Sequence, residues 1–253
     1  IHWHREMSQY FRDNDPYRHL VTTHWSSNYT VINHAIASLP ALDVLTTDAY
    51  SNGLGRTEEV LDYMAGTTEY AKNIGKPTFI TEFGGHPMGD CMPVLKRQLH
   101  MGNWHGFFGK HAVLPMFWWF AIVDEENLYG EYAAISSFMA EEDPRGMQSQ
   151  DRMLTDDGLR LAMLQGRDRN LLWVYDTEYF FSSDETLEPT LVRDLVFSVG
   201  GLKSGEYTVE YWDCRKGEVT HSEVLRVGTD GACRLKLPPF RGDLALKVIP
   251  AEK

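Results

Sequence analysis

The stretch GKPTFITEFGG, residues 75–85, joins the end of a helix to a short apolar strand that stops on a glutamate and two glycines. Gly75 and Pro77 are typical of a helix end, and the letters PTFITEF predict a strand. Reactive groups of parallel α/β proteins gather at the carboxyl ends of their strands. Glu82 is therefore a candidate functional residue rather than a charge that merely reaches solvent.

An alternation of strands and helices extends over residues 1–146. The sequence predicts strands at 18–25, 41–50, 77–83 and 112–120, and helices at 3–14, 57–74, 93–109 and 132–140. The strands are apolar without a clean period of two, which favours parallel strands that are covered on both faces. This part of the chain is predicted to be an α/β domain.

Residues 147–253 have a different pattern. Short apolar segments such as EYTVEYWD, CRLKLP and DLALKVIP are separated by turn sequences such as SSDE, RKGE and GTDG. This spacing predicts an antiparallel β-sandwich. Trp173 and Trp212 lie in these strands, and we expect them to serve packing rather than to form sugar platforms.

Composition excludes several classes of function. The 253-residue chain carries a net charge of −12 and has no run of Lys or Arg, which argues against a nucleic-acid partner. No apolar run is long enough to span a membrane. Cys91, Cys214 and Cys233 are too few for a disulfide framework or a zinc site, and three free thiols are favoured over a Cys214–Cys233 pair.

The carboxyl ends of the four predicted strands bring polar and aromatic residues to one edge of the sheet. These residues are His24, Trp25, Asp48, Tyr50, Glu82, Trp118 and Trp119, with His86 on the loop that follows Glu82. Aromatic rings that stack on sugars, placed beside a carboxylate, indicate a carbohydrate site. The alternative for each tryptophan is a place in the core.

The ordered segments DPYRHLVTT, LTTDAYS, GKPTFITEFGG and PMFWWF resemble a clan A glycoside hydrolase of the family 5 type. The resemblance implies the last four strands of a (β/α)8 TIM barrel (strands 5–8 equivalent) over residues 1–146, followed by an accessory β-sandwich at 147–253. It also implies that Glu82 is the nucleophile, that Tyr50 hydrogen-bonds to it, and that Trp118 or Trp119 forms the floor of a sugar subsite. Asp48 stands where the clan usually has histidine.

The resemblance implies retaining hydrolysis of a β-linked poly- or oligosaccharide, with no cofactor and no metal. The residues expected to bind substrate are Trp118, Trp119, Asp48, His24, Trp25 and His86. A retaining enzyme needs a second carboxyl group about 5–5.5 Å from the nucleophile. In the clan that general acid/base ends the fourth strand, so we expect it in a missing upstream half.

A half-barrel exposes apolar edges, so we expect a homo-oligomer or an association with a chain that supplies the N-terminal half-barrel. The sequence leaves the compartment open. Secretion or a periplasmic location is expected if the chain is part of a longer polysaccharide-degrading enzyme.

Two other functions compete with hydrolysis at Glu82. One is a catalytically incomplete carbohydrate-binding or scaffold protein, because the chain lacks the acid. The other is a metal-dependent TIM-barrel hydrolase that uses His2 and His4, with further ligands among His19, His24, His86, His105 and Asp124. Against the second, no strand precedes His2, and residues two apart do not share a helix face.

Overall fold

The computed structural model describes residues 1–251 and contains both helices and sheets, as expected for a mixed α/β protein. The chain divides into two compact units, residues 1–120 and 121–253. This division precedes the predicted domain boundary at 146/147 by the two short helices α5 (Phe120–Glu125) and α6 (Tyr129–Met139). The boundary at 146/147 remains a prediction.

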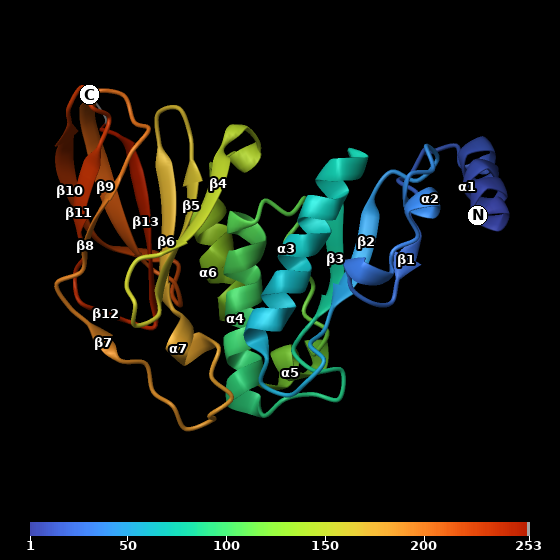
Figure 1. The fold of residues 1–253 in the computed structure, drawn as a ribbon, viewed down its shortest axis with the longest axis horizontal. Coiled ribbons are helices and arrows are strands. Elements are labelled where there is room, and N and C mark those ends of the chain that lie inside the picture. Colours follow the sequence, from blue (N-terminus) through green and yellow to red (C-terminus); the bar gives the residue numbers. More distant parts are fainter. Residues whose placement is uncertain (252–253) are drawn as a thin grey trace. The chain divides into compact units, whose positions relative to one another are not determined.

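The first unit is built on a parallel sheet with the strand order β1-β2-β3 (Figure 1). Its elements are α1 (His2–Asn14), β1 (His24–Trp25), η1 (Tyr29–Val31), α2 (His34–Ala37), β2 (Leu45–Ala49), α3 (Thr57–Ile74), β3 (Thr78–Phe83) and α4 (Met92–Phe108). Helix α3 ends as predicted, because Gly75 adopts the left-handed conformation that terminates helices, with φ of 69°.

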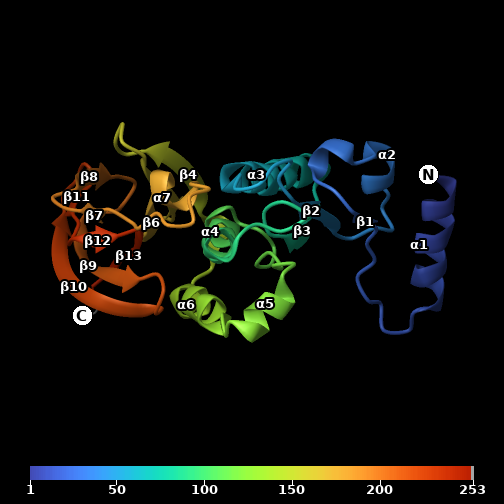
Figure 2. The ribbon, with the colours of Figure 1, turned by 90° about the horizontal axis from the view of Figure 1, so that it is seen from below.

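Helices α3 and α4 cover one face of this sheet. Thr47 Oγ1 on β2 lies 3.2 Å from Thr67 Oγ1 on α3. A Cβ atom at Gly102 on α4 would lie 2.1 Å from the Phe83 ring, so only glycine allows this close packing. Figure 2 shows α3 along β2 and β3. We call the opposite side of the three strands the open face.

The predicted strand at 112–120 is wrong in its extent. Within the described chain this segment forms only a single parallel bridge, between Phe83 and Phe117. It still runs beside β3, since Met116 N donates to Ile80 O (3.0 Å) and Trp118 N donates to Phe83 O (2.8 Å). Pro115 has no N–H to donate, which interrupts the ladder. The strand predicted at 18–25 is likewise reduced to β1.

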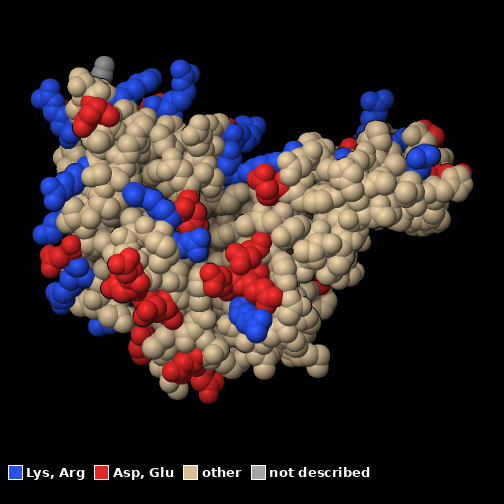
Figure 3. Space-filling view, in the orientation of Figure 1, with Lys and Arg blue, Asp and Glu red and all other residues tan. Residues whose placement is uncertain are grey.

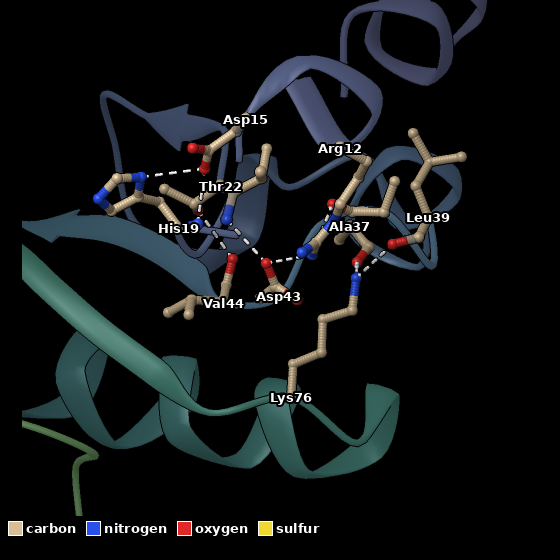
Figure 4. Close-up of polar contacts among 11 residues, drawn as sticks. Arg12, Asp15, His19, Thr22, Ala37, Leu39, Asp43, Val44 and Lys76 are labelled. Atoms are coloured by element: carbon tan, nitrogen blue, oxygen red, sulfur yellow. Dashed lines mark hydrogen bonds and ion pairs between the residues drawn. The ribbon is translucent and has the colours of Figure 1, made fainter. Parts of the chain in front are cut away.

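A polar network holds the amino-terminal ends of the strands, opposite the end that carries Glu82 (Figure 4). Asp43 forms an ion pair with Arg12 of α1 and accepts a 2.7 Å hydrogen bond from Val21 N. Lys76 Nζ donates to the carbonyl oxygens of Ala37 (2.5 Å) and Leu39 (2.8 Å). These contacts tie α1 to the segment before β2, and the end of α2 to the segment before β3.

The second unit contains a six-stranded antiparallel sheet with the order β10-β9-β13-β6-β5-β4 and two two-stranded sheets, β11-β8 and β12-β7. The strands are β4 (Gln148–Met153), β5 (Leu159–Gln165), β6 (Asn170–Asp176), β7 (Leu191–Val192), β8 (Val196–Val199), β9 (Gly205–Asp213), β10 (Glu218–Val227), β11 (Cys233–Lys236), β12 (Phe240–Arg241) and β13 (Asp243–Pro250), with η2 (Pro144–Gly146) and α7 (Thr177–Phe180). One apolar core joins the large sheet to the small ones. No sheet formed by residues 1–251 closes on itself.

The tryptophans and cysteines of the second unit serve packing. Trp173 is fully buried, and its Nε1 donates to Asp243 Oδ2 (2.9 Å). The Trp212 ring packs edge-on against Phe138. Cys214 and Cys233 are buried and Cys91 is exposed, all three as free thiols.

On the face drawn in Figure 3, the Lys and Arg side chains of the described residues are interspersed with Asp and Glu and do not merge into one continuous basic patch. The helices formed by residues 1–251 are all too short or too polar to cross a bilayer.

A buried ion pair attaches the end of α6 to the large sheet. Lys247 on β13 is only 5% exposed, and its Nζ lies 3.0 Å from Glu142 Oε1. The same nitrogen lies 5.1 Å from the centre of the Phe138 ring and 4.9 Å from that of Trp212. Arg169 Nη1 lies 3.0 Å from Glu142 Oε2. One buried carboxylate therefore balances two cations.

Removing Glu142 is expected to cost more stability than removing Lys247. The E142Q variant leaves the buried Lys247 without an anion and Arg169 with only Asp168, and it should lower the free energy of unfolding by about 3 kcal/mol. The matched K247M variant should cost less, because Arg169 still pairs with Glu142. Urea unfolding followed by tryptophan fluorescence checks the order. A larger loss in K247M than in E142Q would contradict the shared-anion arrangement.

His111 is held neutral inside the first unit. Its Nε2 lies 3.2 Å from Thr68 Oγ1 on α3. Burial, with a smaller contribution from His105, lowers the pKa of His111 from 6.5 to about 3. Between those values the unfolded chain binds a proton that the folded chain does not bind, so folding stability falls as the pH falls.

The free energy of unfolding is therefore expected to decrease from about pH 6.5 to pH 5, by at most ~1.4 kcal/mol per pH unit from this group. The H111Q variant lacks the titrating imidazole and should show a shallower slope over the same interval. Urea unfolding of both proteins at several pH values measures the difference. Equal slopes would show that His111 is not the group responsible.

Candidate active site

A β-bulge at Thr81 sets the direction of Glu82. Thr47 pairs with Ile80, but the next residue, Asp48, pairs with Glu82, so Thr81 is an extra residue in β3. Its Oγ1 donates to Thr47 O (3.1 Å) and lies 3.3 Å from Asp48 Oδ1. Regular alternation would place Glu82 on the same side as the fully buried Ile80. The bulge turns Glu82 to the open face beside Asp48.

Three neighbouring strands each contribute one polar side chain to this position. His24 on β1 lies with its Nε2 2.8 Å from Asp48 Oδ1 on β2. One donor atom from each of His24, Asp48 and Glu82 lies within 4.8 Å of the other two. His24 is 38% exposed at its side chain and Asp48 is 3% exposed as a residue, so the group is open on the side of His24.

The pKa of Asp48 depends on its burial and on the neighbouring Glu82 and His24. Burial raises the pKa of Asp48, and the nearby Glu82 acts in the same direction, while the hydrogen bond from His24 opposes both. Two adjacent carboxylates repel each other when both are ionised. The imidazole therefore offsets part of the cost of placing Asp48 beside Glu82.

Tyr50, which directly follows β2, reaches Glu82. Its Oη donates to Glu82 Oε2 at 2.9 Å, as the sequence predicted for this pair. Burial, the hydrogen bond to Glu82 and the Glu82 charge raise the pKa of the phenol. Tyr50 thus remains a hydrogen-bond donor that orients the Glu82 carboxylate.

The two tryptophans that follow the bridge at Phe117 take different places. Trp119 Nε1 donates to Gly84 O (2.7 Å), and its ring packs on the glycine loop, where a Cβ at Gly84 would lie 2.7 Å from the ring. Trp118 is 42% exposed. Of the two, Trp118 has the freer ring, whereas Trp119 anchors the loop behind Glu82.

Asp90 holds the same loop from the other side, a role that sequence reasoning missed. Its Oδ1 accepts from Gly55 N (2.8 Å), and its Oδ2 accepts from Gln98 Nε2 (2.8 Å) and His86 N (3.4 Å). The loops after β2 and β3 are therefore joined through one carboxylate. The sequence predicts a functional residue on this loop at His86 but not at Asp90.

Trp25 and His86 make other contacts in the first unit, and their binding of substrate stays a prediction. Trp25 pairs with Thr47 and packs against the cluster of Ala37, Leu45 and Ala71 on the helix-covered side. The alternation along a strand places neighbouring side chains on opposite faces, so His24 reaches Asp48 and Trp25 does not. His86 closes a turn in the loop, where its Nδ1 accepts from Met88 N (3.1 Å).

The histidines at the amino terminus do not join this group. His2 and His4 lie on α1, and His2 forms an exposed ion pair with Glu6 at 3.1 Å. Among residues 1–251, the His, Cys, Asp and Glu side chains that converge closely enough to share an ion are His24, Asp48 and Glu82. This donor set differs from the one based on His2 and His4.

No family model matches the sequence, and no curated protein matches it. Three solved glycoside hydrolases share its fold over 98% of the chain. A GH30 endoxylanase from Clostridium papyrosolvens C71 has 11% identity and a TM-score of 0.54, over 61% of its own length. A glucosidase from Croceicoccus marinus has 12% identity and a TM-score of 0.53, over 64% of its length. A 4-O-alpha-L-rhamnosyl-beta-D-glucuronidase from Fusarium oxysporum 12S has 12% identity and a TM-score of 0.55, over 64% of its length.

These similarities define the fold. At 11–12% identity they show a shared fold and no particular family, family 5 included. The chain spans less than two thirds of the length of each of these structures.

Proposed function

We propose that this chain forms part of a retaining glycoside hydrolase that acts on a β-linked poly- or oligosaccharide, with Glu82 as the nucleophile. The observation that carries the proposal is the 2.9 Å hydrogen bond from Tyr50 Oη to Glu82 Oε2. A nucleophilic carboxylate must be ionised and must point at the anomeric carbon, and a phenol that donates to one oxygen favours both. The fold shared with three glycoside hydrolases supports the same choice.

The bulge at Thr81 supports the role of Glu82. It places a half-buried carboxylate on the open face, with His24 and Asp48 beside it and the exposed Trp118 on the neighbouring segment. An aromatic face of this kind stacks on a sugar ring, and Trp118 is the better candidate because Trp119 is bonded to Gly84. His24 borders the same face and is available to a substrate hydroxyl.

Asp48 does not supply the general acid/base. One of its carboxylate oxygens lies within 4.8 Å of one of Glu82. However, it is 3% exposed and accepts hydrogen bonds from His24 and Thr81, so it cannot reach a leaving-group oxygen. We propose that the acid/base comes from the part of the barrel that the longer glycoside hydrolase structures contain and residues 1–253 do not.

The second candidate is a carbohydrate-binding or scaffold protein that keeps the sugar-facing residues without catalysis. It is favoured by the absence of a second exposed carboxylate beside Glu82 in the group that residues 1–251 bring together. The two candidates predict the same binding of sugar but differ in whether a covalent bond to Glu82 forms.

Covalent labelling separates them. A 2,4-dinitrophenyl 2-deoxy-2-fluoro-β-glycoside needs little acid assistance, because dinitrophenolate leaves easily, and the fluorine slows the later hydrolysis. We expect the β-glucoside or β-xyloside of this type to add one fluorosugar to the chain at Glu82, as measured by intact mass and peptide mapping. Binding of these sugars without a mass increase would favour the scaffold protein.

Two variants serve as matched controls for the labelling. E82Q should abolish it with little loss of folding stability. Y50F should slow it about tenfold or more, because a hydrogen bond to a charged group contributes about 1.5–3 kcal/mol. Labelling at full rate in E82Q would remove Glu82 from the mechanism.

We further propose that the chain associates with a second copy or with a chain that supplies the missing half-barrel. Apolar side chains are exposed along α1 and the segment that follows it, namely Ile1, Trp3, Tyr10, Phe11, Tyr17 and Leu20. Trp3 is 65% exposed. Of the residues of α1, Ser8 is the one that is buried. A surface of this kind is typical of a contact with another polypeptide.

Size-exclusion chromatography with light scattering should therefore show a mass above that of the 29.0 kDa monomer. The double variant W3S/F11S should shift the population toward the monomer, because it removes two exposed aromatic contacts and no buried one. A monodisperse monomer of the unaltered chain would contradict the proposed association.

A further inference from the structure

We propose that His24, Asp48 and Glu82 bind a divalent transition-metal ion of the zinc class, and that this ion blocks Glu82. The second part rests on the proposed function of Glu82, whereas the first part stands on the geometry alone. On the sequence alone, His24 is named only as a further ligand of a metal held by His2 and His4, and not together with Asp48 and Glu82.

His24, Asp48 and Glu82 supply donor atoms of the kinds that bind zinc. An imidazole nitrogen and two carboxylate groups come from three adjacent parallel strands, with one donor atom of each within 4.8 Å of the others. A tetrahedral zinc ion needs donor atoms about 3.4 Å apart, from bond lengths of about 2.0–2.2 Å. The His24 Nε2–Asp48 Oδ1 separation is already 2.8 Å, so small side-chain movements complete the set.

Hydroxyl groups of Thr81 and Tyr50 contact the two carboxylates. Side chains that hold metal ligands in place usually bond to the ligand atoms from behind. Thr81 Oγ1 lies 3.3 Å from Asp48 Oδ1, and Tyr50 Oη donates to Glu82 Oε2 at 2.9 Å. Both carboxylates are therefore oriented by hydroxyl groups of neighbouring residues, without any need for the ion.

The electrostatics favour a cation. Asp48 is 3% exposed and stands beside a second carboxylate, so the pair concentrates negative charge where solvent is excluded on one side. In the metal-free state, the contact between His24 and Asp48 offsets part of that charge. A divalent ion would offset more of it, through a larger charge and three ligands rather than two.

The choice of metal class follows from the ligands. A nitrogen donor beside two carboxylates suits Zn²⁺ and its transition-metal neighbours, whereas Mg²⁺ and Ca²⁺ prefer oxygen donors only. Exposure of His24 at 38% of its side chain gives the ion a path from solvent. An ion bound there would occupy the carboxylate that is proposed to attack the sugar.

The direct test is titration of the full chain with ZnCl₂ in a calorimeter and with CoCl₂ by visible absorption. We expect one ion per chain and a Co²⁺ spectrum of low coordination number. H24A and D48N should each weaken Zn²⁺ binding by at least about tenfold. H24Q, at an exposed position, keeps the test valid if D48N does not fold.

The matched control is the double variant H2A/H4A, which removes the histidine pair on α1 and leaves the three proposed ligands intact. Unchanged Zn²⁺ binding in this variant, with loss in H24A, supports the site. Loss in H2A/H4A with retention in H24A would overturn it. Absence of Zn²⁺ binding by the unaltered chain would overturn it as well.

The effect of the bound ion on Glu82 is measured separately, by the rate of fluorosugar labelling. Saturating Zn²⁺ should slow fluorosugar labelling of Glu82 at least about tenfold in the unaltered chain, and H24A should need at least about tenfold more Zn²⁺ for the same effect. If Glu82 is not labelled even without Zn²⁺, the proposed function fails while the Zn²⁺ and Co²⁺ titrations still decide the metal site. Labelling that Zn²⁺ does not slow, in a chain shown to bind it, overturns the blocking role.

Discussion

The candidate site depends on one irregularity in the backbone, the bulge that makes Thr81 an extra residue in β3. Without it, the side chain of Glu82 would follow Ile80 toward the helices, where a carboxylate has no partner and burial is costly. With the bulge, the side chains of Thr81 and Glu82 both lie on the open face. The Phe83 ring lies on the helix-covered face, where it packs against Gly102. The alternation of side chains is thus interrupted at Thr81, and the Glu82 carboxylate lies on the open face at the end of an apolar strand.

The bulge also creates the electrostatic problem that the neighbouring residues resolve. It sets Glu82 opposite the buried Asp48, and two carboxylates at this separation disfavour each other's ionised form. His24 relieves the charge on Asp48, and Tyr50 donates to Glu82. The same arrangement explains how one group of side chains can be considered both for nucleophilic catalysis and for binding a cation.

In the second unit, buried charges lie on Glu142 and Lys247 and are arranged differently. Glu142 contacts both Lys247 and Arg169, and the rings of Phe138 and Trp212 cover the lysine ammonium. Here each cation contacts the buried carboxylate, which suits an attachment of a helix to a sheet. Around Glu82, two carboxylates share one imidazole and the group is open to solvent at His24, which suits a binding site.

The sequence by itself determined the elements whose causes are local. Helix α3 ends at Gly75 as expected, and the order of strand ends predicted the polar edge. The hydrogen bond from Tyr50 to Glu82 was implied by the resemblance and not by either segment alone. Tertiary structure decided what depends on pairing between distant segments. The bulge needs the register of β2 against β3, the place of Trp25 needs the pleat of β1, and the role of Asp90 needs Gly55, 35 residues away. A hydrogen bond between two strands has no local signature in either of them, so only the folded chain shows which face Glu82 occupies.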